Sequence, residues 1–320
     1  MRRDKHRASR PIADYFSAYA WGVLGFNLAV ILWGAFVRAT GSGAGCGSRW
    51  PSCNGQVIPR SPELETIIEF THRASSGVLL LLVAGLVIGA FRFFPKGHLV
   101  RLGAVLAGCF LVLEAFLGAS LVLFGWVTTN DSVARVVVMG VHLVNTLLLT
   151  AWLTLTAWWA TYPDQRLELS SHRRTFTLLV IGLAGVLVLA ISGAIAALGD
   201  TLFPASSLFE GLSQDVSPGA HLLLRLRTLH PLIAVLVGLY VGIFMFRLQS
   251  SHSSLQTASL ARSVLSLVIL QLALGALNVI LLAPVWMQIV HLLVADLIWI
   301  ALVLTSVSAL SRTIQAPASR

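Results

Sequence analysis

The sequence predicts an all-α integral membrane protein with eight transmembrane helices. Of its 320 residues, 57% are hydrophobic and only 11% are charged, whereas a soluble domain carries about 25% charged residues. The mean hydropathy is +0.84. These values exclude a soluble enzyme, a disordered chain and a disulfide-rich secreted module. The net charge of +9 does not indicate nucleic-acid binding, because the basic residues lie in short segments between apolar runs.

The eight predicted helices are apolar runs long enough to cross a bilayer. A membrane-spanning helix needs roughly 20 mostly apolar residues, because lipid offers no partners to unpaired backbone groups. The runs are centred near Val30, Leu81, Leu113, Leu149, Val186, Val237, Ile269 and Ile300.

The Lys and Arg residues separate between the two sides of the predicted membrane. Fifteen of the 22 lie on the side of the N-terminus and seven on the opposite side. Since basic residues accumulate on the cytoplasmic side, we expect a multi-pass protein of a bacterial-type plasma membrane with both termini cytoplasmic. The basic opening MRRDKHRASRP is then a cytoplasmic tail rather than part of a signal peptide. Two long loops, about 40–66 and 198–224, would face outward.

The chain contains an internal repeat. Gly34 recurs as Gly193, 159 residues later, and His72 recurs as His230, 158 residues later. An even number of helices in each copy keeps both copies in the same orientation. We therefore expect two tandem four-helix bundles related by a pseudo-twofold axis, a first half over residues 1–161 and a second half over residues 162–320.

A Gly-Ala step lies in each odd-numbered predicted helix. Small residues of this kind serve close helix packing. Their occurrence at matched places also suggests notches that let a flat ligand approach the backbone. The four steps are Gly34-Ala35, Gly118-Ala119, Gly193-Ala194 and Gly275-Ala276.

Each even-numbered predicted helix carries one histidine about two turns from its outer end: His72, His142, His230 and His291. An ionisable group within the membrane is costly and indicates function. Two imidazoles that face each other across a bundle are suited to be the axial ligands of a haem, whereas zinc or copper prefers three or four ligands. The alternative is unpaired structural histidines. Haems at this depth would place their propionates near three outer arginines, unless these only extend to the interface: Arg73, Arg225 and Arg227.

The two halves differ in their acidic residues. Glu69 precedes His72 by three residues and shares its helix face, and its repeat counterpart is Arg227. Glu114 similarly corresponds to the neutral Gln271. A carboxylate beside a haem is suited to relay protons, which favours chemistry in the first half and electron transfer in the second. Glu69 has an alternative role as a charge that stabilises a helix N-terminus, and Glu114 has one as an interhelical hydrogen-bond partner.

Cys46 and Cys53 lie in the first outer loop, within TGSGAGCGSRWPSCNG. The outer side of a bacterial plasma membrane permits disulfides. The residues alone leave two possibilities, a structural disulfide or a redox-active pair that handles substrate.

These features together resemble the haem A synthase family, in particular its branch with a cysteine pair in the first outer loop. The resemblance is carried by TGSGAGCGSRWPSCNG, by the Glu-x-x-His-Arg segment at Glu69 and by the paired histidines. It implies an oxidoreductase that converts the C8 methyl group of haem O to a formyl group, which gives haem A for terminal oxidases.

The resemblance also implies roles for individual residues. His230 and His291 would hold a permanent haem b, His72 and His142 would bracket the substrate haem, and Glu69 would be the catalytic carboxylate. Cys46 and Cys53 would form the disulfide of the family. The expected partners are haem O, the farnesyltransferase that makes it, the cytochrome oxidase assembly machinery and an electron donor that no motif identifies.

Two other functions compete with this hypothesis. A non-catalytic di-haem cytochrome b would have two similar sites, which the Glu69–Arg227 difference disfavours. A transporter built from repeats would have broken helices and binding sites at the midplane, whereas these histidines lie near one face.

Overall fold

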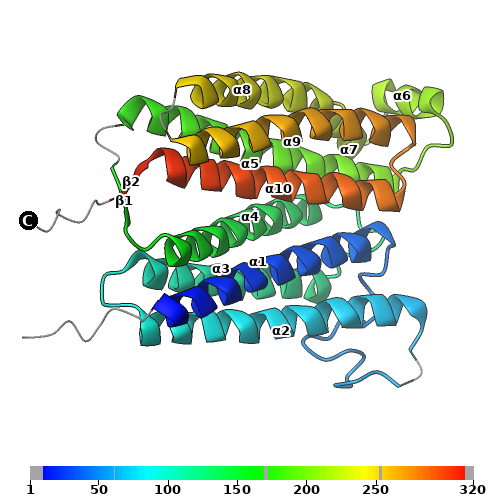
Figure 1. Ribbon diagram of the computed structural model, residues 1–320. Coiled ribbons are helices and arrows are strands. Elements are labelled where there is room, and N and C mark those ends of the chain that lie inside the picture. Colours follow the sequence, from blue (N-terminus) through cyan, green and yellow to red (C-terminus); the bar gives the residue numbers. More distant parts are fainter. Residues whose placement is uncertain (1–9, 61, 169–171, 252–253, 314–320) are drawn as a thin grey trace, which may run out of the picture.

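The computed structural model describes residues 10–60, 62–168, 172–251 and 254–313. These residues form long antiparallel helices that lie side by side (Figure 1). In chain order the elements are α1 (Arg10–Ala39), α2 (Leu64–Phe93), α3 (Leu99–Leu123), α4 (Val133–Thr161), β1 (Gln165–Leu167), α5 (Arg173–Leu202), α6 (Leu208–Val216), α7 (Leu222–Arg227), α8 (Leu229–Ser251), α9 (Leu255–Ile280), α10 (Val285–Ala309) and β2 (Ser311–Thr313).

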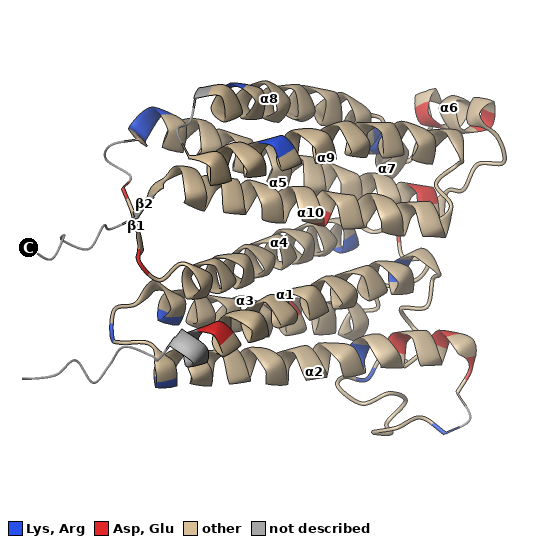
Figure 2. Ribbon diagram, viewed as in Figure 1, with Lys and Arg blue, Asp and Glu red and all other residues tan. Residues whose placement is uncertain are grey.

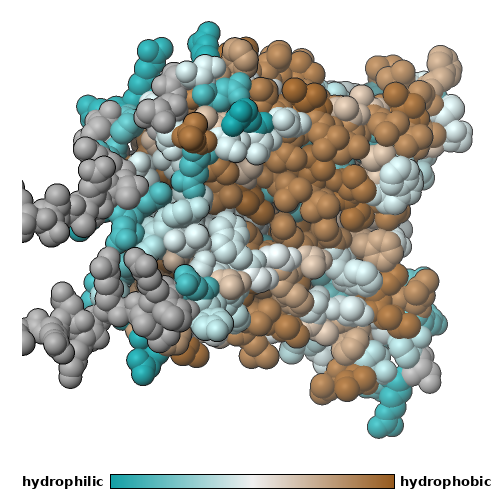
Figure 3. Space-filling model, viewed as in Figure 1, coloured by the Kyte–Doolittle hydropathy of each residue, from teal (hydrophilic) through white to brown (hydrophobic). Residues whose placement is uncertain are grey.

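The described residues contain eight candidate membrane spans, which confirms the eight predicted apolar runs. The sixth span, Leu222–Ser250, combines α7 and α8. Lys, Arg, Asp and Glu gather mainly toward the two ends of the helices (Figure 2), and a hydrophobic band covers the middle of the viewed face (Figure 3). The chain is therefore a multi-pass helical membrane protein.

The spans pack in two rings of four. In the first ring, α1 and α3 each pack against both α2 and α4. In the second, α5 and α9 each pack against both α8 and α10. Helices α2 and α4 thus face each other across the first ring, and α8 and α10 do so across the second. The twofold relation between the rings stays a prediction.

Four helices form the junction between the rings, α1 and α4 of the first ring and α5 and α10 of the second. Helix α4 packs against α5 and α10, and α1 packs against α10. Leu147, Trp299 and Val303 form a small buried cluster at this junction, and the Trp299 indole N–H donates a 2.7 Å hydrogen bond to the Leu147 carbonyl. The junction is thus closely packed and partly hydrogen-bonded.

Local sequence explains where several helices begin and end. Ser132, Ser207 and Ser254 cap α4, α6 and α9, each accepting a hydrogen bond from a backbone N–H of the first turn. Pro231 explains the separation of α7 from α8, because proline has no N–H for the carbonyl of Arg227 and its ring would clash with that carbonyl. The second helix therefore restarts at Leu229, with Pro231 in its first turn.

Two features were not predicted from the sequence. Strands β1 and β2 pair antiparallel, with Arg166 opposite Arg312, and lie where α4 and α10 end, at the end of the molecule at which α1 starts (Figure 1). Helix α6 lies at the opposite end of the molecule, which we call the loop end. The first long loop, residues 40–63, joins α1 to α2 at the loop end and is called the disulfide loop.

Candidate functional site

The structure brings the four histidines together in two pairs. His72 on α2 and His142 on α4 lie on facing helices of the first ring and interact electrostatically. His230 on α8 and His291 on α10 have the same relation in the second ring. Each ring of helices therefore has two imidazoles that come from opposite helices.

Each imidazole lies against the glycine of a Gly-Ala step. A Cβ atom built on the glycine would lie close to the imidazole Cε1: 2.8 Å for Gly34 and His72, 3.8 Å for Gly118 and His142, 3.0 Å for Gly193 and His230, and 3.2 Å for Gly275 and His291. The glycines thus accommodate the imidazole rings themselves. The expectation that they also let a flat ligand approach the backbone stays a prediction.

Polar neighbours of His230 and His142 favour the tautomer with the proton on Nδ1 and none on Nε2. Ser192 donates its one hydroxyl proton to the Leu189 carbonyl at 2.7 Å, so its oxygen accepts from Nδ1–H of His230 at 3.0 Å. The Nδ1 atom of His142 lies 3.2 Å from Oε1 of Glu114, an atom that only accepts. A proton on Nδ1 leaves the Nε2 lone pair for a metal.

Glu114 and Gln271 occupy equivalent places beside the histidines. Glu114 also accepts hydrogen bonds from Asn145, at 2.6 Å, and from the Thr146 hydroxyl. The side-chain amide of Gln271 lies 3.1 Å from Nε2 of His291 and donates to the His291 carbonyl at 3.1 Å. A metal bound at Nε2 of His291 would replace the amide contact. Glu114 is thus both an interhelical hydrogen-bond partner and a histidine neighbour.

The donor set fits a haem in each half. Nδ1 of His72 and Nδ1 of His291 are buried without a hydrogen bond in the described part of the chain. No group of three or more His, Cys, Asp or Glu side chains suited to a metal ion occurs among the described residues. Two imidazoles from facing helices match the axial ligation of a haem.

A disulfide joins Cys46 and Cys53, with 4.3 Å between their Cα atoms. Both cysteines are buried. The Cys46 carbonyl accepts a hydrogen bond from the Asn54 N–H at 2.9 Å. The expected disulfide is therefore confirmed, and it closes a compact loop at the end of the first ring.

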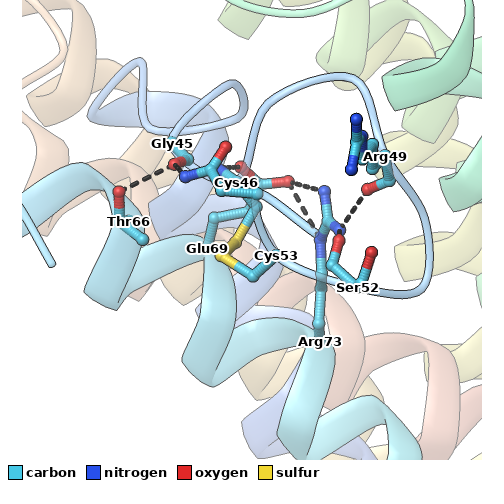
Figure 4. A network of polar contacts seen from close by, with 9 residues as sticks. Gly45, Cys46, Arg49, Ser52, Cys53, Thr66, Glu69 and Arg73 are labelled. Carbon is cyan, nitrogen blue, oxygen red and sulfur yellow. Dashed lines mark hydrogen bonds and ion pairs between the residues drawn. A yellow bond between two sulfur atoms is a disulfide. The ribbon is translucent and has the colours of Figure 1, made fainter. Parts of the chain in front are cut away.

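Glu69 holds this loop (Figure 4). It is only 3% exposed, and its Oε2 atom accepts a 2.7 Å hydrogen bond from the Cys46 N–H. Its Oε1 atom pairs with Arg73 at 2.5 Å. Arg73 in turn donates to the carbonyls of Arg49, at 2.7 Å, and Ser52, at 2.8 Å. The carboxylate predicted to be catalytic thus also connects α2 to the disulfide loop, both directly and through Arg73.

Arg227, the counterpart of Glu69, has a similar place in the second half. It donates to Asp215 at 2.8 Å and to Asp200 at 3.1 Å, and Asp215 lies on α6. Arg225 donates to the Pro218 carbonyl at 2.5 Å. The three arginines expected near propionates, Arg73, Arg225 and Arg227, are therefore engaged with the loops, and their role toward a haem stays a prediction.

Sequence reasoning missed two arginines at the loop end. Arg38 donates to Gln288 and to two groups on α5, and Arg135 is only 3% exposed. The available signal was their spacing, because Arg38 follows Gly34 by four residues and Arg135 precedes His142 by seven. Both therefore lie on helix faces that carry residues of the histidine site.

Known proteins resemble this chain over different lengths. Proteins from two strains of Thermus thermophilus named "Protoheme IX farnesyltransferase" are 52% identical over 302 residues, which is 94% of this chain and 50% of theirs. The chain thus spans about half the length of these curated relatives. "Heme A synthase" of Halalkalibacterium halodurans is 45% identical over 96 residues, 30% of this chain and 32% of that protein. "Heme A synthase" of Bacillus mycoides is 43% identical over 98 residues, 31% of this chain and 32% of that protein.

The family comparison covers most of the chain. Residues 17–303, from within α1 to within α10, match the family described as "Cytochrome oxidase assembly protein". The match includes the disulfide loop and all four site histidines. The chain therefore belongs to the cytochrome oxidase assembly protein family.

Proposed function

We propose that the protein is a haem A synthase, an oxidoreductase that oxidises the C8 methyl group of haem O to a formyl group by successive hydroxylation. The product, haem A, serves terminal oxidases. Relatives named "Heme A synthase", at 43–45% identity over part of the chain, support this activity. Membership of the cytochrome oxidase assembly family supports it independently.

The observation that carries the proposal is the pair of similar histidine sites with unequal surroundings. Both sites have imidazoles on facing helices against glycines. The first site has the carboxylate of Glu114 beside Nδ1 of His142, and its repeat counterpart in the second site, the amide of Gln271, lies beside Nε2 of His291. A difference of this kind is expected where one haem is transformed and the other only transfers electrons.

The first half would bind the substrate and the second would keep a cofactor. His72 and His142 would hold haem O, whereas His230 and His291 would hold haem b. A bound haem iron supplies the oxygen chemistry that an unreactive methyl group requires. Glu114, whose Oε1 atom lies 3.2 Å from Nδ1 of His142, would orient this histidine, as partners of metal-ligating histidines do.

Glu69 would serve as the catalytic carboxylate of the first half. Its burial and its position three residues before His72 support this role. Its contacts with Arg73 and the Cys46 N–H fix the carboxylate and tie it to the disulfide loop. A positioned carboxylate of this kind is suited to accept or donate a proton as the methyl group is oxidised.

A farnesyltransferase that makes haem O is the proposed partner. The name of the Thermus thermophilus relatives and the match to half of their length support this pairing. We place the protein in the bacterial plasma membrane with both termini cytoplasmic. The distribution of basic residues supports that orientation.

Analysis of the haems formed in cells tests the proposed activity. The protein is produced together with a haem O synthase in a host that lacks haem A, and the extracted haems are separated by chromatography. We expect haem A and its hydroxylated precursor, neither of which appears without this chain. If haem O accumulates unchanged while the purified protein carries haem, the chain is a non-catalytic di-haem cytochrome b.

A further inference from the structure

Arg38 is a half-buried cation whose hydrogen bonds all go to neutral acceptors. From the last turn of α1 it reaches across to the second half. It donates to the Ala197 carbonyl, Thr201 Oγ1 and Gln288 Oε1, each at 2.9 Å. None of the ion pairs between described residues includes it. Its charge is therefore not neutralised by direct contact with a carboxylate.

Arg135 is a buried cation with an unused donor. Its Nη1 atom donates to the carbonyls of Thr128, at 2.7 Å, and Asn130, at 2.5 Å. Its Nε atom is buried and has no hydrogen-bond partner in the described part of the chain. Leaving a buried donor of a charged group unpaired is costly. An arrangement of this kind points to a ligand that supplies the missing acceptor.

The two arginines lie at the same end of the first histidine site. Arg38 is about one turn beyond Gly34, the glycine that contacts His72, and Arg135 is about two turns before His142. Helices α1 and α4 pack directly, and the two guanidinium groups interact electrostatically. Two like charges in such a setting are unfavourable unless an anion accompanies them.

Two acids interact with the arginines, and both have other partners. Asp131 interacts electrostatically with Arg135, but it is exposed and its Oδ2 atom lies 3.5 Å from Nε2 of His221. Asp200 interacts electrostatically with Arg38, but its Oδ1 atom forms an ion pair with Arg227 at 3.1 Å. The arginine pair, Arg38 and Arg135, therefore retains excess positive charge. A ligand with two negative groups would neutralise it.

We propose that the arginine pair binds the two propionates of the haem held between His72 and His142, so that this site selects a porphyrin dicarboxylate. This inference rests on the proposed function of the first half. Arg73, which the sequence suggested for the role, is engaged with Glu69 and the disulfide loop. The C8 methyl group neighbours a propionate on the macrocycle, so binding the propionates fixes the carbon to be oxidised. The arginine pair is thus a specificity determinant for the proposed reaction.

A comparison of two probes tests the arginine pair directly. Iron protoporphyrin IX and its dimethyl ester, whose propionates are neutral, are titrated into the purified full-length protein with its second site already filled. Binding is followed in the Soret region. We expect the wild type to prefer the diacid. Arg38→Gln and Arg135→Gln should each weaken diacid binding by about 10- to 100-fold, the range for a hydrogen bond to a charged group, and leave ester binding unchanged.

Three variants control the experiment. Arg60→Gln removes an exposed cation of the disulfide loop and should keep the wild-type preference. Arg135→Lys keeps the charge and should retain part of the preference, which guards against a folding defect in Arg135→Gln. His72→Ala should abolish binding of both probes, which locates them in the first half.

The outcomes separate this inference from the proposed function. If both Gln variants keep the wild-type preference while His72→Ala abolishes binding, the arginine pair does not bind propionates but the first half remains a haem site. If His72→Ala leaves binding intact, the assignment of the first half fails and the inference fails with it.

Discussion

Gly34 and Gly118 lie at equivalent places in the first half but leave different amounts of space. An added Cβ atom would lie 2.8 Å from the His72 ring at Gly34 and 3.8 Å from the His142 ring at Gly118. The first distance is too short for two carbon atoms, whereas the second is an ordinary contact. Substitutions at these two glycines are therefore a matched pair.

We expect Gly34→Ala to displace the His72 imidazole and Gly118→Ala to leave His142 in place. Disturbing the orientation of a metal ligand costs about 10- to 100-fold in affinity, and the first variant should lose haem affinity at the first site by that factor. Soret titration with iron protoporphyrin IX measures the effect. Equal affinities of the two variants would contradict the close contact at Gly34.

Glu69 combines two roles that substitution can separate. Glu69→Gln keeps the shape and an acceptor for the Cys46 N–H but removes the charge and the transferable proton. Haem A formation should fall by about 10²- to 10⁴-fold, the usual effect of losing a positioned acid–base group, while haem b content stays near normal. The ratio of haem A to haem O in cells supplied with haem O measures the effect.

Arg73→Gln is the matched control for Glu69→Gln. It breaks the same 2.5 Å ion pair but leaves the carboxylate in place. If Glu69 acts in the chemistry, Arg73→Gln should be much less harmful. If the two variants lose activity equally, Glu69 acts only by holding the disulfide loop.

Sequence reasoning identified the residues of the site but not their orientation. The four histidines and the glycines follow from a repeat that is readable in the chain. Their mutual contact does not, because it depends on which helices are neighbours. The partners of Glu69 were also unpredictable, since the Cys46 N–H and the carbonyls of Arg49 and Ser52 belong to an irregular loop.

At the scale of elements, the disulfide loop is constrained by a disulfide and by hydrogen bonds to α2. The Cys46–Cys53 disulfide closes it, the Thr66 hydroxyl donates to the Gly45 carbonyl at 2.7 Å, and Glu69 contacts the Cys46 N–H. The disulfide closes the loop on itself, and the other two contacts fix it to the first turns of α2.

We expect Cys46 and Cys53 to resist alkylation in the isolated protein. After denaturation without a reductant, N-ethylmaleimide should label Cys109, the free cysteine of the chain, and neither loop cysteine. Mass spectrometry of peptides measures the label, and Cys109 serves as the internal positive control. Labelling of all three cysteines would mean that the pair is reduced and would contradict the disulfide.

The long helices were predictable because a bilayer requires long apolar runs. The short elements were not. Helix α6 has only nine residues, and β1 and β2 have three each, too few for a periodic signal. The separation of α7 from α8 was open to prediction from Pro231, since proline interrupts the helix before it.

The whole molecule joins two similar halves through an asymmetric junction. Trp299 of α10 donates to the Leu147 carbonyl of α4, and Arg38 of α1 donates to Thr201 and Gln288 of the second half. The repeat predicted two like halves, but these contacts arise where the halves differ. The repeat therefore predicted two histidine sites. How the two halves pack against each other could be seen only from the side-chain contacts at the junction.

The central claim is that the two histidine pairs hold different haems. The most direct test is the haem content of His142→Ala and His291→Ala, purified from cells that also make haem O. We expect His291→Ala to lose haem b and keep haem O or haem A, and His142→Ala to lose haem O and haem A and keep haem b. Loss of the same haem from both variants would contradict the division of the protein into a substrate half and a cofactor half.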